Sequence, residues 1–351
     1  MARPFARIPS RHQKTAAFTL VELLVVITIM AILAALLIPA VISAQRRAQS
    51  TRIKMEIDQL ATGFEDYRND VAGEYPPNAW FVNSQTHNAN AVVRHFKKAF
   101  PRHREPEALI RGLSGYGTGT VVLPGGLSPA EAVFFWLGGF SSDPKYPISG
   151  PGGPSFLVGQ LDNIEDRNRT YDFDLTRLGT GEGIDVQTAL QNGSVRAVQY
   201  SFGNQTRRIN FWQYYPPKST KPFVYFDTSR SKPRAHETAI YASAVVHPTI
   251  AGVAPIKRLA TTLVSPSNPT IQDVRYANED KFQILHAGVD DDWGGDIDSD
   301  NSLFDAVRIN FFNPSASLPT GILLYPDGPF TAELGDTVVN FDERTLQDAQ
   351  P

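Results

Sequence analysis

Two hydrophobic patterns follow one another near the N-terminus. From Leu23 to Gln45 no side chain is ionisable, and a helix of this length spans roughly 34 Å, enough for the hydrocarbon core of a bilayer. Beyond Pro39, apolar side chains recur at spacings of three and four and so share one helical face: Ile53, Ile57, Leu60, Phe64, Tyr67 and Val71. We therefore predict one long helix, with a transmembrane half over residues 18–45 and an amphipathic half over residues 46–72.

The remainder, residues 73–351, predicts a globular head of the α+β class. Gly73 and the prolines that follow it end the helix. Helical segments at 91–99 and 129–137 accompany short β-like runs at 195–202, 222–227, 240–246, 282–287 and 337–341. We expect the amphipathic half of the helix to pack on an antiparallel sheet with large insertions. A free coiled coil is less favoured, because the heptad pattern stops at Gly73.

Composition narrows the classes of protein that fit. The 351 residues include no cysteine, which excludes disulfides, zinc-thiolate sites and thiol nucleophiles. The formal net charge is −3, but the basic residues that precede Phe18 lie in a leader without acids. The leader holds four of the 33 Lys and Arg residues, namely Arg3, Arg7, Arg11 and Lys14. Without it, 29 basic residues remain against 36 acidic ones. A protein of that sign has no overall attraction for nucleic acid or anionic lipid, so no nucleic-acid partner is expected.

The basic leader, residues 1–17, predicts the orientation in the membrane. Positive charges before a membrane helix favour a cytoplasmic N-terminus, which places the head outside the inner membrane in a single-pass topology. An ordinary secretory signal has a shorter apolar core, with its cleavage site after that core. The longer run found here indicates a segment that is retained, and a plain signal anchor is one reading of it.

The string FTLVE at residues 18–22 resembles the prepilin-type cleavage and methylation motif of type IV pilins and type II secretion pseudopilins. The resemblance implies that a prepilin peptidase cuts between Ala17 and Phe18 and methylates the new N-terminus. Ala17 stands where the family usually has glycine. It also implies that the protein waits in the inner membrane until assembly machinery polymerises it, with other copies and other pilins or pseudopilins, into a filament.

Glu22 and Pro39 have the assembly roles that the resemblance implies. Glu22 is the fifth residue after the cut, where the family keeps a glutamate that attracts the methylated amino group of an adjacent subunit. An intramembrane carboxylate is by default a functional residue with a partner, although a solvated position at headgroup level is the alternative. Pro39 lacks one helical N–H, so we expect it to bend or loosen the helix.

The string YRNDVAGEYPP at residues 67–77 is most similar to the start of the head in the G-type major pseudopilin of type II secretion. The head is much longer than that of a typical member, and residues from about 80 to 275 form an insertion that the resemblance covers poorly. One reading is a structural subunit of a type II secretion pseudopilus or of a type IV pilus-like filament. The alternative is a minor pilin whose enlarged head binds a surface, secreted cargo or DNA, although the acidic composition weighs against DNA.

An acidic loop follows the predicted strand at 282–287. Six aspartates lie within residues 290–300, and closely spaced carboxylates with glycines suit Ca²⁺. G-type pseudopilins bind calcium in a C-terminal loop after such a strand, and the string GDTVVNF at 335–341 resembles the end of that loop. The resemblance implies a calcium-loop region over 282–341, with a solvated acidic loop as the alternative. The candidate ligands are Asp290, Asp292, Asp296, Asp298, Asp300 and Asp336.

Motifs for catalysis are weak. The glycines at 115–119 lack the third glycine of a dinucleotide fingerprint, and the residues around Ser114 depart from the nucleophile-elbow pattern. The histidines are dispersed, and Arg94-His95 and residues 102–104 read as exposed basic patches. We therefore predict a structural protein rather than an enzyme.

Overall fold

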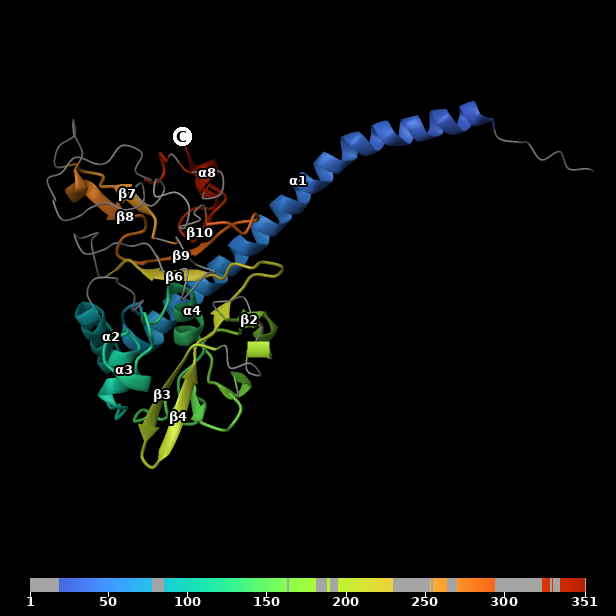
Figure 1. The fold of residues 1–351 in the computed structure, drawn as a ribbon. Coiled ribbons are helices and arrows are strands. Elements are labelled where there is room, and N and C mark those ends of the chain that lie inside the picture. Colours follow the sequence, from blue (N-terminus) through green and yellow to red (C-terminus); the bar gives the residue numbers. More distant parts are fainter. Residues whose placement is uncertain are drawn as a thin grey trace, which may run out of the picture. The chain divides into compact units, whose positions relative to one another are not determined.

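The computed structural model describes residues 19–77, 85–162, 164–180, 188–189, 195–229, 253, 255–263, 270–293, 324–328, 330 and 335–350. The chain divides into two compact units, residues 1–49 and 50–351. The helices are α1 (Leu20–Tyr67), α2 (Gln85–Ala99), α3 (Glu107–Gly112), α4 (Pro129–Leu137) and α8 (Leu346–Ala349) (Figure 1). The strands are β1 (Ser155–Leu157), β2 (Leu178–Gly179), β3 (Ala197–Phe202), β4 (Gln205–Asn210), β5 (Gln213–Tyr214), β6 (Val224–Asp227), β7 (Lys257–Leu259), β8 (Val274–Tyr276), β9 (Phe282–His286) and β10 (Val338–Val339).

The first unit contains the N-terminal part of α1, where the large apolar side chains are exposed. Leu36, for example, is 71 % exposed. Pro39 lies inside α1, and the helix continues beyond it to Tyr67. By length and composition this helix can cross a membrane.

In the second unit, the amphipathic part of α1 packs as its spacing predicts. Ile53, Ile57, Leu60, Phe64 and Tyr67 are buried, and Val71 packs against the same core. A π turn over Arg68–Ala72 follows, and Gly73 ends it with a φ of 64°, its N–H donating to the Arg68 carbonyl. Burial of one large apolar side chain contributes about 1.5–3 kcal/mol, so this face anchors the helix to the head.

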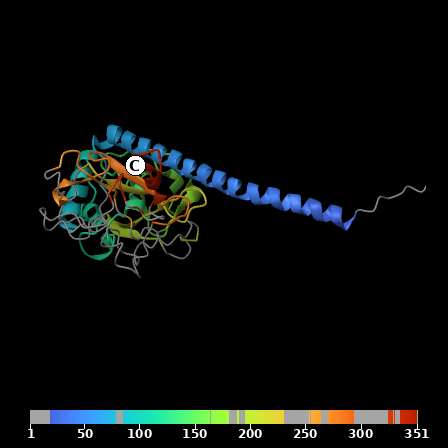
Figure 2. The ribbon, with the colours of Figure 1, turned by 90° about the horizontal axis from the view of Figure 1, so that it is seen from above.

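An antiparallel sheet in the order β10-β9-β6 covers the buried face of α1. The Phe64 ring stacks on Tyr225 of β6 with centroids 4.0 Å apart, and it also contacts Phe282 of β9. Val224 of β6 pairs with Leu285 of β9, which pairs in turn with Val339 of β10. The part of α1 from Ser50 onward lies along one side of the head in two perpendicular views (Figures 1 and 2). The predicted helix on an antiparallel sheet is thereby confirmed.

A second antiparallel sheet has the order β1-β4-β3, and two strand pairs, β2-β5 and β7-β8, complete the strands of the described residues. The runs predicted at 195–202, 222–227, 282–287 and 337–341 contain β3, β6, β9 and β10. The run predicted at 240–246 lies outside the described residues. The head is therefore of the α+β class, as predicted.

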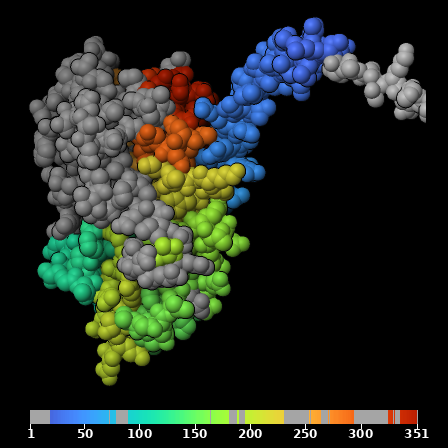
Figure 3. All heavy atoms as spheres, turned by 45° about the vertical axis from the view of Figure 1, so that its right-hand side comes forward, coloured from blue at the N-terminus to red at the C-terminus, as the bar shows by residue number. Residues whose placement is uncertain are grey.

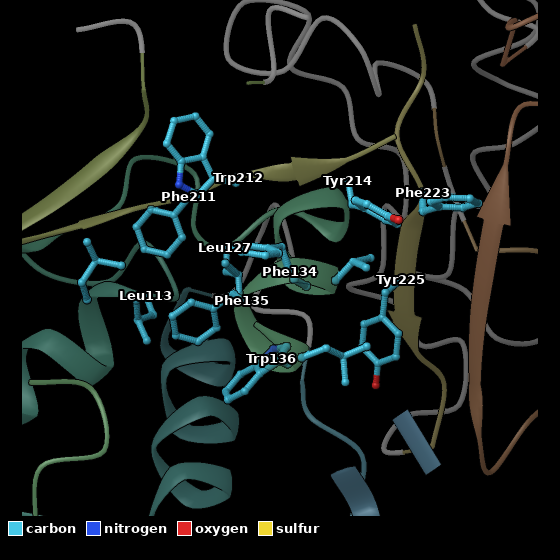
Figure 4. Close-up of a cluster of buried hydrophobic side chains, with 14 of the residues drawn as sticks. Leu113, Leu127, Phe134, Phe135, Trp136, Phe211, Trp212, Tyr214, Phe223 and Tyr225 are labelled. Carbon is cyan, nitrogen blue, oxygen red and sulfur yellow. The ribbon is translucent and has the colours of Figure 1, made fainter. Parts of the chain in front are cut away.

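Helix α4 lies at the centre of the main core, and all of its residues are buried. A helix that is apolar on every side is expected to be buried on every side. Ser128 and Glu131 form a capping box at its start. Around it gather aromatic and aliphatic side chains from α3, β5, β6 and the intervening loops (Figure 4), among them Leu113, Leu127, Phe211, Trp212, Tyr214, Phe223 and Tyr225.

Two polar contacts fasten α1 to distant parts of the head. Arg177 donates two hydrogen bonds from Nη1 to Glu56, at 2.8 and 2.9 Å, and its guanidinium lies over the Tyr214 ring. Lys54 Nζ donates to the Val339 carbonyl of β10 at 3.2 Å. Segments far apart in sequence therefore hold the same helix.

Candidate functional site

The predicted assembly residue Glu22 lies in the first turn of α1 and is engaged locally. Its Oε2 accepts hydrogen bonds from the backbone N–H and the side-chain hydroxyl of Thr19, both at 2.8 Å. In return the Thr19 hydroxyl accepts from the Glu22 N–H at 3.2 Å. This reciprocal arrangement is a capping box, which satisfies donors that a helix start otherwise leaves unpaired.

The capping box is the feature of this segment that sequence reasoning missed. The string Thr-Leu-Val-Glu at 19–22 has the spacing of a capping box directly before an apolar run, so the signal was present. Ala17 and Phe18, the predicted cleavage residues, lie outside the described residues. The Glu22 carboxylate can still accept a hydrogen bond from a further partner, because a carboxylate has acceptor sites for several donors.

The acidic loop begins where β9 ends. Gly288 has a φ of 97°, and a Cβ at this position would lie 2.3 Å from the Asp336 carbonyl oxygen. Two hydrogen bonds fix the neighbouring backbone: Val289 N–H donates to Asp336 Oδ2 at 3.2 Å, and Asp292 N–H donates to Asp290 Oδ1 at 3.1 Å. The structure therefore brings Asp336 to the start of the loop, across a long stretch of sequence.

The electrostatics of this loop are unfavourable for negative charge. Burial raises the pKa of the Asp290 carboxyl, and the nearby charges of Asp336 and Asp292 raise that pKa further. Thr337 is fully buried, and its hydroxyl finds no hydrogen-bond partner within the described ranges. No three His, Asp or Glu side chains of those ranges gather into a group that could hold a metal ion. The other predicted ligands, Asp296, Asp298 and Asp300, lie outside the described residues.

The family model described as the prokaryotic N-terminal methylation motif matches residues 12–38. The chain carries a prepilin-type N-terminal methylation motif. The matched residues include Ala17, Phe18 and Glu22 and stop before Pro39. The match is consistent with the type IV pilin and pseudopilin family, a structural rather than enzymatic family, and it does not single out the G-type. Neither a curated protein nor a solved structure matches the chain.

His286 connects the acidic loop of this motif-bearing protein to another loop of the head. Its Nδ1 accepts from the Gly288 N–H at 3.1 Å, and its Nε2 lies 3.0 Å from the Lys221 carbonyl. These contacts require a neutral imidazole with its proton on Nε2. The Asp291 carboxylate accepts from the Ser219 hydroxyl and from the Thr220 N–H, and its Oδ1 lies 3.9 Å from His286 Nε2.

We expect acid to destabilise the head through His286. Burial lowers the pKa of this imidazole from 6.5 to about 4. The unfolded chain therefore binds a proton below pH 6.5 while the folded one does not, and stability falls as the pH drops from 6.5 towards 4, by up to about 3 kcal/mol. Urea unfolding of the full chain in detergent across this range measures the loss.

The His286→Asn variant is the control for the pH effect. An asparagine amide oxygen can accept from the Gly288 N–H but does not titrate in this range. The difference in unfolding free energy between pH 6.5 and 4 should therefore shrink by most of that amount. Parallel pH profiles for the two proteins would show that His286 does not cause the acid sensitivity.

The basic patch predicted at Arg94-His95 requires a correction. Arg94 is exposed, but His95 is fully buried. Its Nε2 lies 3.0 Å from the Tyr67 hydroxyl and its Nδ1 lies 3.1 Å from Glu74 Oε1. His95 points inward because successive helical positions face different directions, and position 95 lies on the face of α2 that packs on α1 and on Trp136.

Proposed function

We propose that this protein is a structural subunit of a type II secretion pseudopilus or of a related type IV pilus-like filament. In this proposal a prepilin peptidase processes it, the inner membrane holds it, and assembly machinery polymerises it with other subunits. The observation that carries the proposal is the methylation motif at residues 12–38, placed at the start of a helix whose apolar side chains are exposed. Such a helix requires a bilayer or neighbouring helices to cover it.

The chemistry of the first turn supports a role in stacking subunits. Glu22 is held at the helix start by Thr19, which fixes its position relative to the helix axis. After cleavage before Phe18, the free amino group of a neighbouring copy offers the positive partner that an intramembrane carboxylate needs. In this mechanism the charge pair sets the axial offset between adjacent helices.

We expect the native protein to begin at Phe18 with an N-methylated amino group. Mass spectrometry of the protein purified from cells with an active prepilin peptidase measures this directly. An Ala17→Arg variant is the control, because a bulky charged residue at the cut should leave the leader attached. An intact leader on the unaltered protein would contradict the processing step and with it the proposed function.

We further propose that the acidic loop holds one Ca²⁺. Two observations support such an ion: the charge of Asp336 raises the pKa of the Asp290 carboxyl, and the buried Thr337 hydroxyl has no hydrogen-bond partner among the described residues. Ca²⁺ takes carboxylate, hydroxyl and carbonyl oxygens. With no cysteine in the chain, an ion that joins the end of β9 to the segment before β10 would take the place of a disulfide.

We expect 1 mM Ca²⁺ to raise the melting temperature of the full chain in detergent by about 5 °C relative to excess chelator. Asp336→Asn should remove most of this rise in melting temperature, because it removes one of the two negative charges, Asp290 and Asp336, that would bind the ion. Asp327→Asn, which alters an exposed acid elsewhere, should retain it. An equal melting temperature with calcium and with chelator would exclude the calcium site.

A further inference from the structure

A basic face remains on the head that the proposed function does not use. It consists of Arg94, Lys97, Arg102, Arg104 and Lys145, all exposed. Arg104 N–H donates to the Lys145 carbonyl at 2.7 Å, which joins the segment after α2 to a loop far along the chain. The charge of Lys97 contributes to lowering the pKa of both His103 and Glu107, after the larger effects of burial and of Arg111 respectively. Lys97 therefore lies close to both.

Four acids lie near the basic face, and Asp143 is the one beside Lys145, whose N–H donates to its Oδ1 at 2.9 Å. The other three are engaged with partners outside this face. Glu105 is buried and accepts from the backbone N–H groups of Ile148 and Ser149. Glu107 pairs with Arg111 at 2.8 Å, and Glu74 pairs with Lys98 at 3.1 Å. In the part of the chain that the structure describes, no residue of the basic face forms an ion pair. An uncompensated cluster of like charges attracts an anionic partner.

An acidic face lies around α8 and consists of Asp327, Glu343 and Asp348, all exposed. The two segments that form it are joined, because the Tyr325 hydroxyl donates to Asp342. Arg344 belongs to the same turn, but its charge is already paired with Asp342 at 3.3 Å. None of the three acids of this face forms an ion pair with another described residue.

The contacts of helix α1 show how far apart the two faces lie. The Tyr67 hydroxyl contacts His95 of α2, beside the basic face. Lys54 contacts β10, and β10 leads into the acidic face. Residues 54 and 67 lie about 20 Å apart along the helix. In the space-filling view the teal surface around α3 lies lower on the head than the red C-terminal surface, and the two do not touch in this view (Figure 3).

We propose that the basic face of one copy docks on the acidic face of a second copy displaced along the filament axis. The proposal rests on the proposed function, in which helices stack in parallel. Parallel stacking with an axial offset places the Tyr67 end of one head, which carries the basic face, near the Lys54 end of the next head, which carries the acidic face. The two faces differ, so the contact is head-to-tail and leaves a free face on each copy, which is the property of an interface that forms open filaments.

The absence of cysteine in the chain permits a direct test by disulfide crosslinking in cells. Cysteine is introduced at 97, 102 or 104, together with cysteine at 327, 343 or 348, and the cells are oxidised. At least one of these pairs should give a ladder of dimers, trimers and larger products. Each single-cysteine variant should give no more than dimers. A pair within one chain cannot close, because a disulfide needs Cα atoms within about 7 Å of each other.

Charge reversal tests whether the contact is electrostatic. In the background of the crosslinking pair, reversal of two other basic-face residues to Glu should reduce the ladder at least five-fold. Reversal of two acidic-face residues to Lys in the same chain should restore it. Lys281→Glu, at an exposed cation outside the basic face, should leave the ladder unchanged. A ladder that is insensitive to reversal would overturn the electrostatic pairing.

The outcomes separate this inference from the proposed function. Filaments that form normally, without a ladder for any of the nine cysteine pairs, would overturn the head-to-tail contact and leave the filament role intact. A ladder on protein that never enters a filament would keep the contact and contradict the filament role. Loss of both would reject both.

Discussion

The Glu22→Gln variant should remain in the inner membrane but fail to form filaments. Glutamine retains an oxygen that can accept from the Thr19 N–H and hydroxyl, so the capping box and the helix start survive. It lacks the negative charge that, in the proposed function, attracts the amino group of a neighbouring Phe18. We expect filament yield, measured by shearing and immunoblotting, to fall at least ten-fold, with unchanged protein in the membrane fraction.

The Thr19→Ala variant is the matched control for this result. It removes the local hydroxyl partner of Glu22 and leaves the carboxylate in place. Loss of one capping interaction costs about 1 kcal/mol, which an apolar membrane helix tolerates, so filaments should still form. The reverse pattern, with normal filaments from Glu22→Gln and none from Thr19→Ala, would assign Glu22 to helix capping alone.

The Gly288→Ala variant should destabilise the head by at least about 3 kcal/mol. At a φ of 97° a side chain is strained, and the added Cβ would meet the Asp336 carbonyl oxygen at 2.3 Å. The backbone on both sides is held, by the pairing of β9 with β10 and by the Val289–Asp336 hydrogen bond. The strain must therefore be relieved by separating Asp336 from the start of the acidic loop, which should also abolish any calcium-dependent rise in melting temperature.

Gly73→Ala separates the cost of backbone strain from that of the steric clash. Gly73 has a φ of 64°, and a Cβ there would meet no atom within 4 Å. We expect a cost of about 1 kcal/mol from the left-handed conformation alone. Urea unfolding of both variants in detergent provides the comparison, and equal losses would show that the Asp336 contact is not rigid.

The elements that could be predicted from sequence are those with a strong local pattern. The 3.6-residue period from Ile53 to Val71 predicted the buried face of α1, and Ser128 with Glu131 marks the start of α4. The strands β7 and β8 and the helix α8 were not predicted. They are short, and β7 is also bridged to a partner far away in sequence, between Arg258 and Tyr325. Such pairings leave little periodicity in the chain itself.

The candidate sites show the same division between local and distant signals. The motif around Phe18 and Glu22 is local and could be read directly, and so could the capping box that was overlooked. The approach of Asp336 to Asp290 was suggested only by family resemblance, because the two are joined through the register of β9 with β10. The hydrogen bond from Ser219 to Asp291 could not be predicted, because Ser219 lies in a loop far away in the sequence and no motif spacing links the two residues.

The fastening of α1 bears on how this protein would carry load. Four residues of α1 contact four different parts of the head. Lys54 contacts β10 and Glu56 contacts the turn before β2, while Phe64 contacts β6 and Tyr67 contacts α2. A pull along the helix axis would load these four contacts in shear, all at the same time, rather than breaking them one after another. A head attached in this way is expected to stay closed under a tension that would peel a single hairpin apart.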